Sequence, residues 1–472
     1  MSNRSIAIAQ SAPAISAPQP ARSRTRALLE GPIIPTLLRL AAPNVVVNVV
    51  LIAVTASVDA YFVGGLGASA LAGIALVFPL IMLMQQMANS SMGGAIAAAV
   101  ARAIGAGRDA DAAALVVHGL VVATGMAAIF TTVLLIGGPA IYRLIGGSDE
   151  IVAAALEYSN ALFSGALAYW VLSTLTSVVR GAGHAAVLAA VYVAAEALHI
   201  VLVPALMFGI GPLPAFGITG AALATVTSFS LSSLVLAVYL LSGRTALRLS
   251  FRGVRLDRRL FTDILRVGAP MSLQPIVNNL TLATLTAFVA TLGPTALAAF
   301  GAAVRLEYFQ IPLTFGLGAA VVAMVGTNLG AGKTSRATRI AWTAAGLAAG
   351  VTAVIGLVAV TAPQLWIGLF SAAPEIRREA ATYLAIAGLS YPFFGVAMML
   401  SSAFQAAGRP AWPLLGVTTR AVVVVAGGFI ALRVLSTSLA GLGVAAAVGL
   451  LVFAAVLTLA FRGGARKHTS RG

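Results

Sequence analysis

A few polar and charged side chains stand inside long apolar stretches, and these are the residues whose types could do chemistry. The stretch Arg39–Gly67 holds a single acid. Its polar residues fall within roughly 60° of one helix face at about 100° per residue: Asn44, Asn48, Thr55 and Asp59. A carboxylate at membrane depth costs about 2.5–3.5 kcal/mol on insertion scales, so the stripe should face protein or water. The pattern predicts an ion-coupling role for Asp59. The alternative is an acid near the outer helix end that reaches the membrane interface.

A second group follows at helical spacing, with Tyr192, Glu196 and His199 on one face near mid-membrane. Glu and His three residues apart can hydrogen-bond, and both can titrate once buried. We predict that Glu196 and His199 share in ion coupling. The alternative is a neutral Glu196 that a neighbouring helix satisfies.

The second half of the chain carries fewer such groups. Gln274, Asn278 and Thr281 share one helix face, and Arg305 and Glu307 stand two residues apart. The last two could neutralise each other or be neutralised by neighbours, and Arg420 needs a partner that the sequence does not identify. We predict a substrate cavity lined by these residues: Asn44, Asn48, Thr55, Tyr192, Gln274, Asn278, Thr281 and Glu307.

No arrangement typical of an enzyme accompanies these groups. The chain has no cysteine, and its four histidines show no metal-ligand spacing. Residues 330–334 resemble the end of a phosphate-binding loop, but Thr327 stands where the first glycine is required. We therefore expect no catalytic residues, no metal and no cofactor beyond the coupling ion.

Composition places these residues in a bilayer. Of 472 residues, 60% are hydrophobic and 9% charged, with a mean hydropathy of +1.00; soluble domains carry about 25% charged residues. Spanning backbone must satisfy its own hydrogen bonds, and the alternation of a barrel is absent, so we predict an all-α polytopic membrane protein. Twelve helices are expected: about 33–63, 69–104, 111–137, 149–179, 185–209, 217–242, 262–291, 295–329, 335–361, 374–406, 411–433 and 440–461.

The sequence also repeats itself at a shift of about 225 to 227 residues. Arg39-Leu-Ala-Ala-Pro43 returns as Arg266-Val-Gly-Ala-Pro270, and Ile104-Gly-Ala-Gly107 returns as Leu329-Gly-Ala-Gly332. Each repeat therefore holds six helices. Because six is even, both repeats should have the same orientation, related by an axis along the membrane normal.

The basic residues predict the orientation in the membrane. With the N-terminus inside, the outer segments hold only Arg143, Arg377, Arg378 and Arg433, so the formal charge of +16 lies almost entirely inside. Both termini and the central loop are thus predicted to be cytoplasmic, with anionic lipids rather than nucleic acid as partner. The predicted division is a disordered tail (1–30), an N-lobe (31–243), a basic linker (244–261), a C-lobe (262–462) and a basic tail (463–472).

Taken together, these motifs resemble the MATE family (multidrug and toxic compound extrusion) across nearly all of residues 30–462. The resemblance rests on Glu30-Gly-Pro32, Val58-Asp59, Gly105-Ala-Gly107, Gly268-Ala-Pro270 and Arg305-Leu-Glu307. The first and last of these motifs are most similar to the DinF-like branch.

The resemblance implies a V-shaped pair of six-helix lobes that exports organic cations by antiport with H⁺ or Na⁺. It also makes Asp59 the N-lobe coupling residue and places Thr225 near the same pocket. Where many members have an Asn and then an Asp before a Pro, this chain has His199 and Val203 before Pro204. The loss of that carboxylate disfavours a Na⁺ site.

We therefore predict a monomeric plasma-membrane exporter of lipophilic, usually cationic compounds, coupled to H⁺. The ion-coupling set is Asp59, Glu196, His199 and Thr225. Three alternatives are kept: a Na⁺-coupled exporter, a flippase for lipid-linked saccharides and a membrane-embedded enzyme. The flippase relatives resemble fourteen-helix proteins with a cationic cavity, and an enzyme would need a catalytic cluster near a membrane face.

Overall fold

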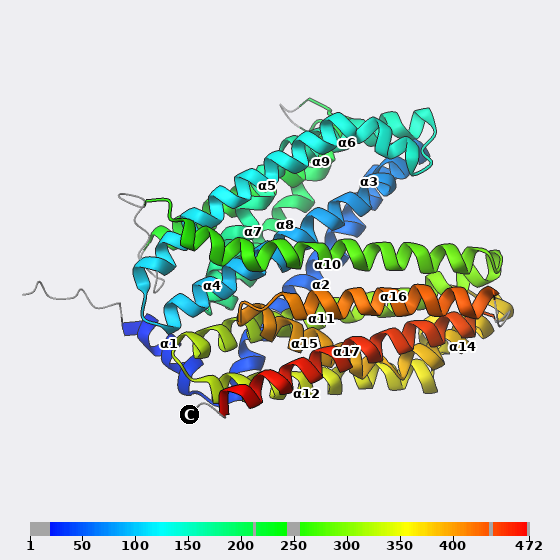
Figure 1. Ribbon diagram of the computed structural model, residues 1–472. Helices are drawn as coiled ribbons and strands as arrows, with labels where there is room; N and C mark the ends of the chain where they lie inside the picture. The colour runs from blue at the N-terminus through cyan, green and yellow to red at the C-terminus, as the bar shows by residue number, and fades with distance from the viewer. Residues whose placement is uncertain (1–18, 211–213, 243–254, 434–437, 470–472) are drawn as a thin grey trace, which may run out of the picture.

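The structure, a computed structural model, describes residues 19–210, 214–242, 255–433 and 438–469; the side chains of residues 19–24, 47, 49–57, 59, 60 and 464–469 lie outside this description. The described chain is helical throughout (Figure 1). Its elements in order are α1 Gln19–Glu30, α2 Ile33–Gly64, α3 Ala68–Gln86, the π-helix η1 Met87–Met92, α4 Gly93–Gly105, α5 Asp109–Leu144, α6 Asp149–Ser164, α7 Ala166–Gly181, α8 Ala185–Phe208, α9 Gly217–Leu241, α10 Arg258–Ala290, α11 Pro294–Gly330, α12 Thr334–Thr361, α13 Gln364–Ile367, α14 Pro374–Gly388, α15 Tyr391–Ala406, α16 Ala411–Arg433 and α17 Leu439–Thr469.

The number of spans agrees with the sequence prediction. Among the described residues, nine continuous helical stretches are long and apolar enough to cross a membrane. Two helix pairs, α6 with α7 and α14 with α15, each add a span that bends by 49°. With the 32-residue α2, these make the predicted twelve.

The repeat is visible in the backbone. The two bent spans occupy equivalent places in the two halves. Gly107 and Gly332 end equivalent helices with φ of 69° and 73°, and Gly183 and Gly408 do so with φ of 79° and 70°. Such left-handed backbone favours glycine, which lacks a Cβ. The sequence repeat therefore marks the same turns in both halves.

Two arms form a V that closes near α1 and α4 and opens toward the other end (Figure 1). The first helix of each repeat crosses between the arms. In α2, Leu37 and Ala41 pack with α11 and α12, whereas Val63 packs with α3 and α8. The N-lobe predicted over 31–243 is thus wrong at its start, because the apolar face of early α2 is buried in the C-terminal arm.

The seventh span, α10, crosses in the opposite direction. Leu260 and Ile264 belong to a hydrophobic cluster of the N-terminal arm, whereas Leu285 and Val289 belong to one in the C-terminal arm. The C-lobe predicted over 262–462 is therefore also wrong at its start, because the beginning of α10 packs in the N-terminal arm. Each arm receives one half-helix from the other repeat.

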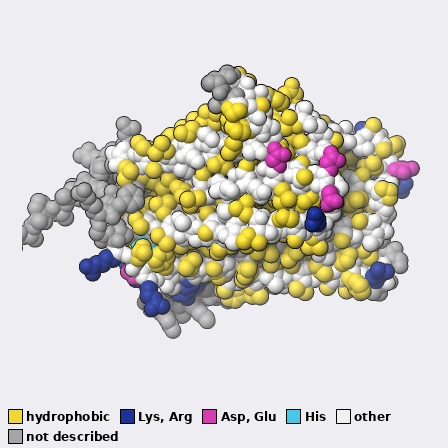
Figure 2. Space-filling model, turned by 90° about the horizontal axis from the view of Figure 1, so that it is seen from above, with side chains coloured by type: hydrophobic (Ala, Val, Ile, Leu, Met, Phe, Trp, Pro, Cys, Tyr) yellow, Lys and Arg dark blue, Asp and Glu magenta, His cyan; other side chains and the backbone are white. Residues whose placement is uncertain are grey.

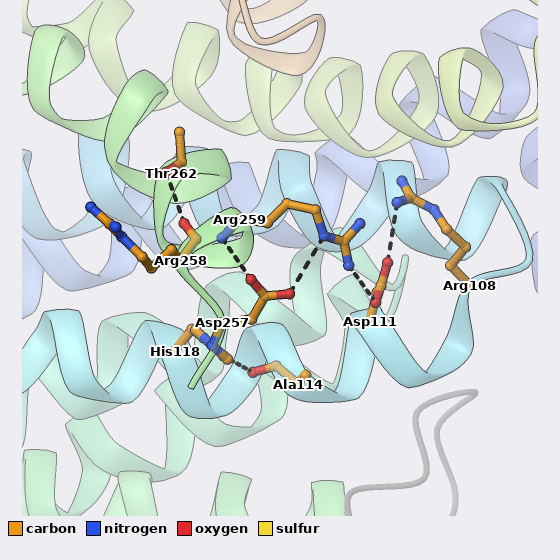
Figure 3. A network of polar contacts seen from close by, with 8 residues as sticks. All are labelled: Arg108, Asp111, Ala114, His118, Asp257, Arg258, Arg259 and Thr262. Carbon is orange, nitrogen blue, oxygen red and sulfur yellow. Dashed lines mark hydrogen bonds and ion pairs between the residues drawn. The ribbon is translucent and has the colours of Figure 1, made fainter. Parts of the chain in front are cut away.

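A polar network fixes the start of α10 to α5 (Figure 3). The Arg259 guanidinium donates to Asp111 at 2.8 Å, and the Asp257 carboxylate caps α10 by accepting from the Arg259 backbone N–H at 2.8 Å. His118 Nε2 accepts from the Asp257 N–H at 2.8 Å, which leaves Nδ1 to donate to the Ala114 carbonyl at 2.8 Å. The linker predicted over 244–261 therefore ends early, at the helix start Arg258; residues 243–254 lie outside the described part.

The tail predicted to be disordered over 1–30 is also partly wrong, because Gln19–Glu30 form α1; residues 1–18 are not described. Leu28 is buried against α11 and α12, and Asn328 Nδ2 donates to its carbonyl oxygen at 3.0 Å. Within α1, Arg26 Nε donates to Glu30 at 2.7 Å, and this hydrogen bond and the attraction lower the pKa of Glu30. The tertiary contacts of Leu28 fix a segment whose own composition is too polar to indicate order.

The surface matches a bilayer protein. In the view of Figure 2, hydrophobic side chains are spread over the whole face, and the few charged side chains lie at its left end and in its right half. Large apolar residues such as Val354, Leu357 and Leu459 are more than 60% exposed. Exposed apolar area on this scale is a feature of membrane or partner contact.

Where the arms meet, α4 and α11 approach with almost no space between them. A Cβ on Gly105 would lie 2.0 Å from the Thr327 carbonyl oxygen, and one on Gly330 would lie 2.1 Å from the Arg102 carbonyl oxygen. The repeat relates these two contacts, because Gly105 is equivalent to Gly330 and Arg102 is equivalent to Thr327. Small residues let membrane helices pack at such short range, so the closed end of the V depends on glycine.

Candidate functional site

Two residues of the predicted polar stripe, Asn44 and Asn48, have described side chains in α2, the helix that crosses between the arms. Asn44 is 5% exposed and donates to the Leu40 carbonyl at 2.8 Å, and Asn48 donates to the Asn44 carbonyl at 2.6 Å. These bonds within the helix satisfy amide donors that lipid would leave unpaired. The side chains of Thr55 and Asp59 lie outside the described residues.

The predicted group on α8 is buried inside the N-terminal arm. Glu196 is 7% exposed, His199 3% and Tyr192 9%, and α8 packs against both α2 and α9. The Tyr192 hydroxyl lies 3.4 Å from the Thr176 Oγ1 of α7. Glu196 and His199 are therefore buried on a helix that packs against α2, and their role in ion coupling stays a prediction.

Thr225 lies on α9 in the same arm. It is 8% exposed and donates to the Ala221 carbonyl of its own helix at 3.1 Å. Val203 is fully buried one turn beyond His199. Its apolar side chain offers no oxygen ligand there.

In the C-terminal arm, polar groups from several helices converge; Tyr383 is buried, Glu307 and Arg420 are half-buried, and Asn278 is exposed. Glu307 accepts a hydrogen bond from the Tyr383 hydroxyl at 3.2 Å and interacts electrostatically with Arg420. Arg420 in turn donates to Asn278 Oδ1 over a long 3.4 Å. The partner of Arg420 is thus the pair Glu307 and Asn278, which joins α10, α11 and α16.

Arg305 and two of the predicted cavity residues, Gln274 and Thr281, stay outside this cluster. Arg305 is exposed and lies 4.9 Å from the centre of the Phe370 ring, so the neighbours, and not Arg305, neutralise Glu307. Gln274 donates to the Met271 sulfur at 2.7 Å, and Thr281 donates to the Val277 carbonyl at 2.7 Å. Both contacts stay within α10.

A polar network between η1 and α7 was not predicted. The Asn89 amide donates to the Tyr169 hydroxyl at 2.5 Å, and Ser173 donates to the Asn89 Oδ1 at 2.9 Å. Farther along α7, Arg180 is only 8% exposed. The sequence could have indicated this polar face, because Ser173, Ser177 and Arg180 stand at helical spacing. Arg180 was interpreted only as one of the basic residues that predict the cytoplasmic side.

None of these groups forms a recognisable metal site. Among the described residues, no three His, Asp or Glu side chains stand close enough together to hold an ion. The site chemistry of the described chain consists of single buried acids beside hydroxyl, imidazole and guanidinium groups.

Known proteins resemble the whole of this arrangement. A model of the MatE family matches residues 45–205 and 270–430, one match in each repeat. A FAD transporter of Shewanella oneidensis is 26% identical over 385 residues, which is 81% of this chain and 84% of that protein. A probable multidrug resistance protein, YoeA of Bacillus subtilis, is 26% identical over 74% of this chain and 76% of its own length.

Solved structures agree with the fold. A multidrug resistance MATE family transporter of the MOP superfamily, described in an outward-facing conformation, superposes with a TM-score of 0.84 at 26% identity. The superposition covers 95% of this chain and 98% of that one. With matches that span both repeats, the chain belongs to the MatE family, whose members are membrane transporters and not enzymes.

Proposed function

We propose that this protein is a secondary active exporter of lipophilic, usually cationic organic compounds, driven by antiport of a coupling cation. The observation that carries the proposal is the burial of Glu196 and His199 inside one arm, beside the helix that bears Asp59. The names of relatives such as the probable multidrug resistance protein of Bacillus subtilis support the substrate class. Localisation to the plasma membrane with both termini inside, a monomeric state and the absence of a cofactor remain part of the same proposal.

We infer that the coupling ion is H⁺. A Na⁺ site requires several oxygen ligands in a fitted cage, and the buried Val203 and the imidazole of His199 supply none. A proton needs only a titratable group whose affinity changes as the arms rearrange. Asp59 would load and release the proton, and Glu196 would share or tune it. Na⁺ coupling stays the alternative, because Asp59, Glu196 and Thr225 carry oxygens.

The test uses purified protein in proteoliposomes with a fluorescent lipophilic cation as cargo. A pH gradient alone should drive efflux in Na⁺-free buffer, and Asp59→Asn should insert normally yet abolish coupled efflux. Glu196→Gln should shift the pH dependence of the rate. Strict dependence on Na⁺ without any response to the pH gradient would refute H⁺ coupling, and active export by Asp59→Asn would refute the role of that residue.

A second candidate function is export of anionic compounds, as the name of the FAD transporter of Shewanella oneidensis suggests for that relative. The observation that favours it is a buried arginine, Arg180, with no carboxylate beside it among the described residues. Competition of the cationic cargo by FAD in the same proteoliposomes tests this candidate.

A further inference from the structure

Arg180 is a buried cation near the end of α7. Its side chain is more than nine-tenths buried, and Nε has no hydrogen-bond partner among the described residues. No ion pair to a described Asp or Glu involves it; the groups that interact with its charge are the hydroxyls of Tyr169 and Tyr192. An ionised side chain within a membrane span is rare enough that function is the default interpretation.

The guanidinium lies where the two arms meet. Its central carbon is 5.2 Å from the centre of the Phe315 ring on α11, so it reaches from one arm to the other. The next residue, Gly181, packs directly on the Ala97 backbone of α4. Helix side chains point toward the N-terminus of their helix. The Arg180 side chain is therefore expected to lie over the preceding turn of α7, which holds Ser177.

Hydroxyl groups surround this cation on the N-terminal arm. Ser177, fully buried and one turn before Arg180, has an Oγ with no partner among the described residues. Tyr169 and Ser173 lie earlier on α7 and are joined by Asn89. Asn89 belongs to η1, and π-helical turns within α-helices are frequent at functional sites.

Two buried donors without partners at adjacent turns call for an acceptor. A guanidinium presents its N–H groups in a fixed fork that matches a carboxylate, and a hydroxyl can add a further bond. The Phe315 ring offers an apolar surface for the part of a compound next to its carboxylate.

We propose that Arg180 and Ser177 bind the carboxylate of an exported compound where the two arms meet. The inference rests on the proposed export function and narrows its substrate class to include lipophilic cations that also carry a carboxylate. A small free carboxylate such as acetate has the same chemistry, so the experiment must separate the two sources.

Two matched probes test the proposal: a rhodamine dye with a free carboxyl group, and the methyl ester of the same dye. Their binding to purified protein is measured by fluorescence polarisation for the wild type, Arg180→Gln and Arg180→Lys. Loss of a charged hydrogen bond should weaken binding of the acid dye about tenfold or more in Arg180→Gln, with the ester changed less than about twofold. Arg180→Lys keeps the charge without the fork and should lose less. Arg462→Gln is the control, because Arg462 also stacks on a ring, at 5.7 Å from Trp342, but is exposed.

Equal weakening of acid and ester dyes would overturn the proposal, because it is the result expected if Arg180 only holds the arms together. Unchanged binding of both dyes would overturn it as well. Acetate could stabilise the wild type but not Arg180→Gln while each dye binds equally well to both proteins. In that case the site holds a free anion, and the assignment to an exported compound is wrong. Should Arg180→Gln fail to fold, Arg180→Lys decides by the same acid-to-ester ratio. Because these are binding measurements, absence of gradient-driven export refutes the proposed function without deciding this site.

Discussion

The closed end of the V should be sensitive to a single methyl group at Gly330. A Cβ there would lie 2.1 Å from the Arg102 carbonyl oxygen, whereas side-chain contacts normally begin near 3.4 Å. The obstacle is backbone of the opposite arm, so α4 and α11 must separate by about 1 Å to admit alanine. Overpacking of this kind costs about 1–3 kcal/mol. If the arms part during transport, Gly330→Ala should therefore raise the fraction open at this end about fivefold to 150-fold.

The chain suits the measurement because it contains no cysteine. Ala98, on α4, is fully buried between the arms beside Val322. In an Ala98→Cys background, a hydrophilic maleimide should label the thiol slowly, and Gly330→Ala should accelerate labelling at least about fivefold if labelling follows the open population. Gly105→Ala, the equivalent change in the other repeat, should do the same.

Gly346→Ala on α12 is the matched control, because its new Cβ would meet nothing within 4 Å. Labelling in this variant should equal that of the parent, since an exposed helical Gly→Ala change affects only helix propensity. Equal labelling rates in Gly330→Ala and Gly346→Ala would refute the reasoning. That result would mean that α4 and α11 are not tightly packed at the closed end.

Three further predictions concern the described contacts. His118→Phe keeps an aromatic ring but removes the acceptor for the Asp257 N–H, so it should lower the free energy of unfolding by about 1–3 kcal/mol. The effect is measured as a lower thermal midpoint in detergent, and an unchanged midpoint would show that this hydrogen bond does not hold the start of α10. Asn328→Leu removes the hydrogen bond to the Leu28 carbonyl of α1, so trypsin should cleave after the exposed Arg26 about fivefold faster in a time course. Equal cleavage rates would show that this hydrogen bond does not keep α1 in place. A cysteine at the exposed Ser148 should react with an impermeant maleimide on intact cells, and one at the exposed Ser242 only after the cells are lysed, because the basic residues predict that orientation; the reverse pattern would overturn the topology.

Hydropathy and the internal repeat were enough to predict the twelve spans, because lipid requires each span to be helical and long. The same information could not reveal that α2 and α10 cross between the arms. Leu37 and Val63 are equally apolar, and only the packing decides that one contacts α11 and the other α3 and α8. For the same reason α1 looked disordered: its order comes from Asn328, 300 residues away in sequence.

The burial of Glu196 and His199 was predictable because their spacing places both on one helix face, whereas their role in ion coupling stays a prediction. The site was not predictable where partners come from different helices. The sequence offered Arg305 as the neighbour of Glu307, but residues two apart point to different sides of a helix. Arg420 and Tyr383, from two other spans, occupy the side that Glu307 faces.

The two arms therefore have equivalent backbone features but different ionisable side chains. The bent spans and left-handed glycines repeat, whereas position 196 carries an acid and its equivalent at 421 is alanine. In the N-terminal arm the buried acid and imidazole lie on α8, which packs against α2, the helix that enters from the other arm. In the C-terminal arm the half-buried acid Glu307 has Arg420 beside it, and Arg420 contacts α10, the other crossing helix, through Asn278. A change of charge in either arm would thus act on a helix that both arms share, which gives a physical route from ion binding to movement of the arms.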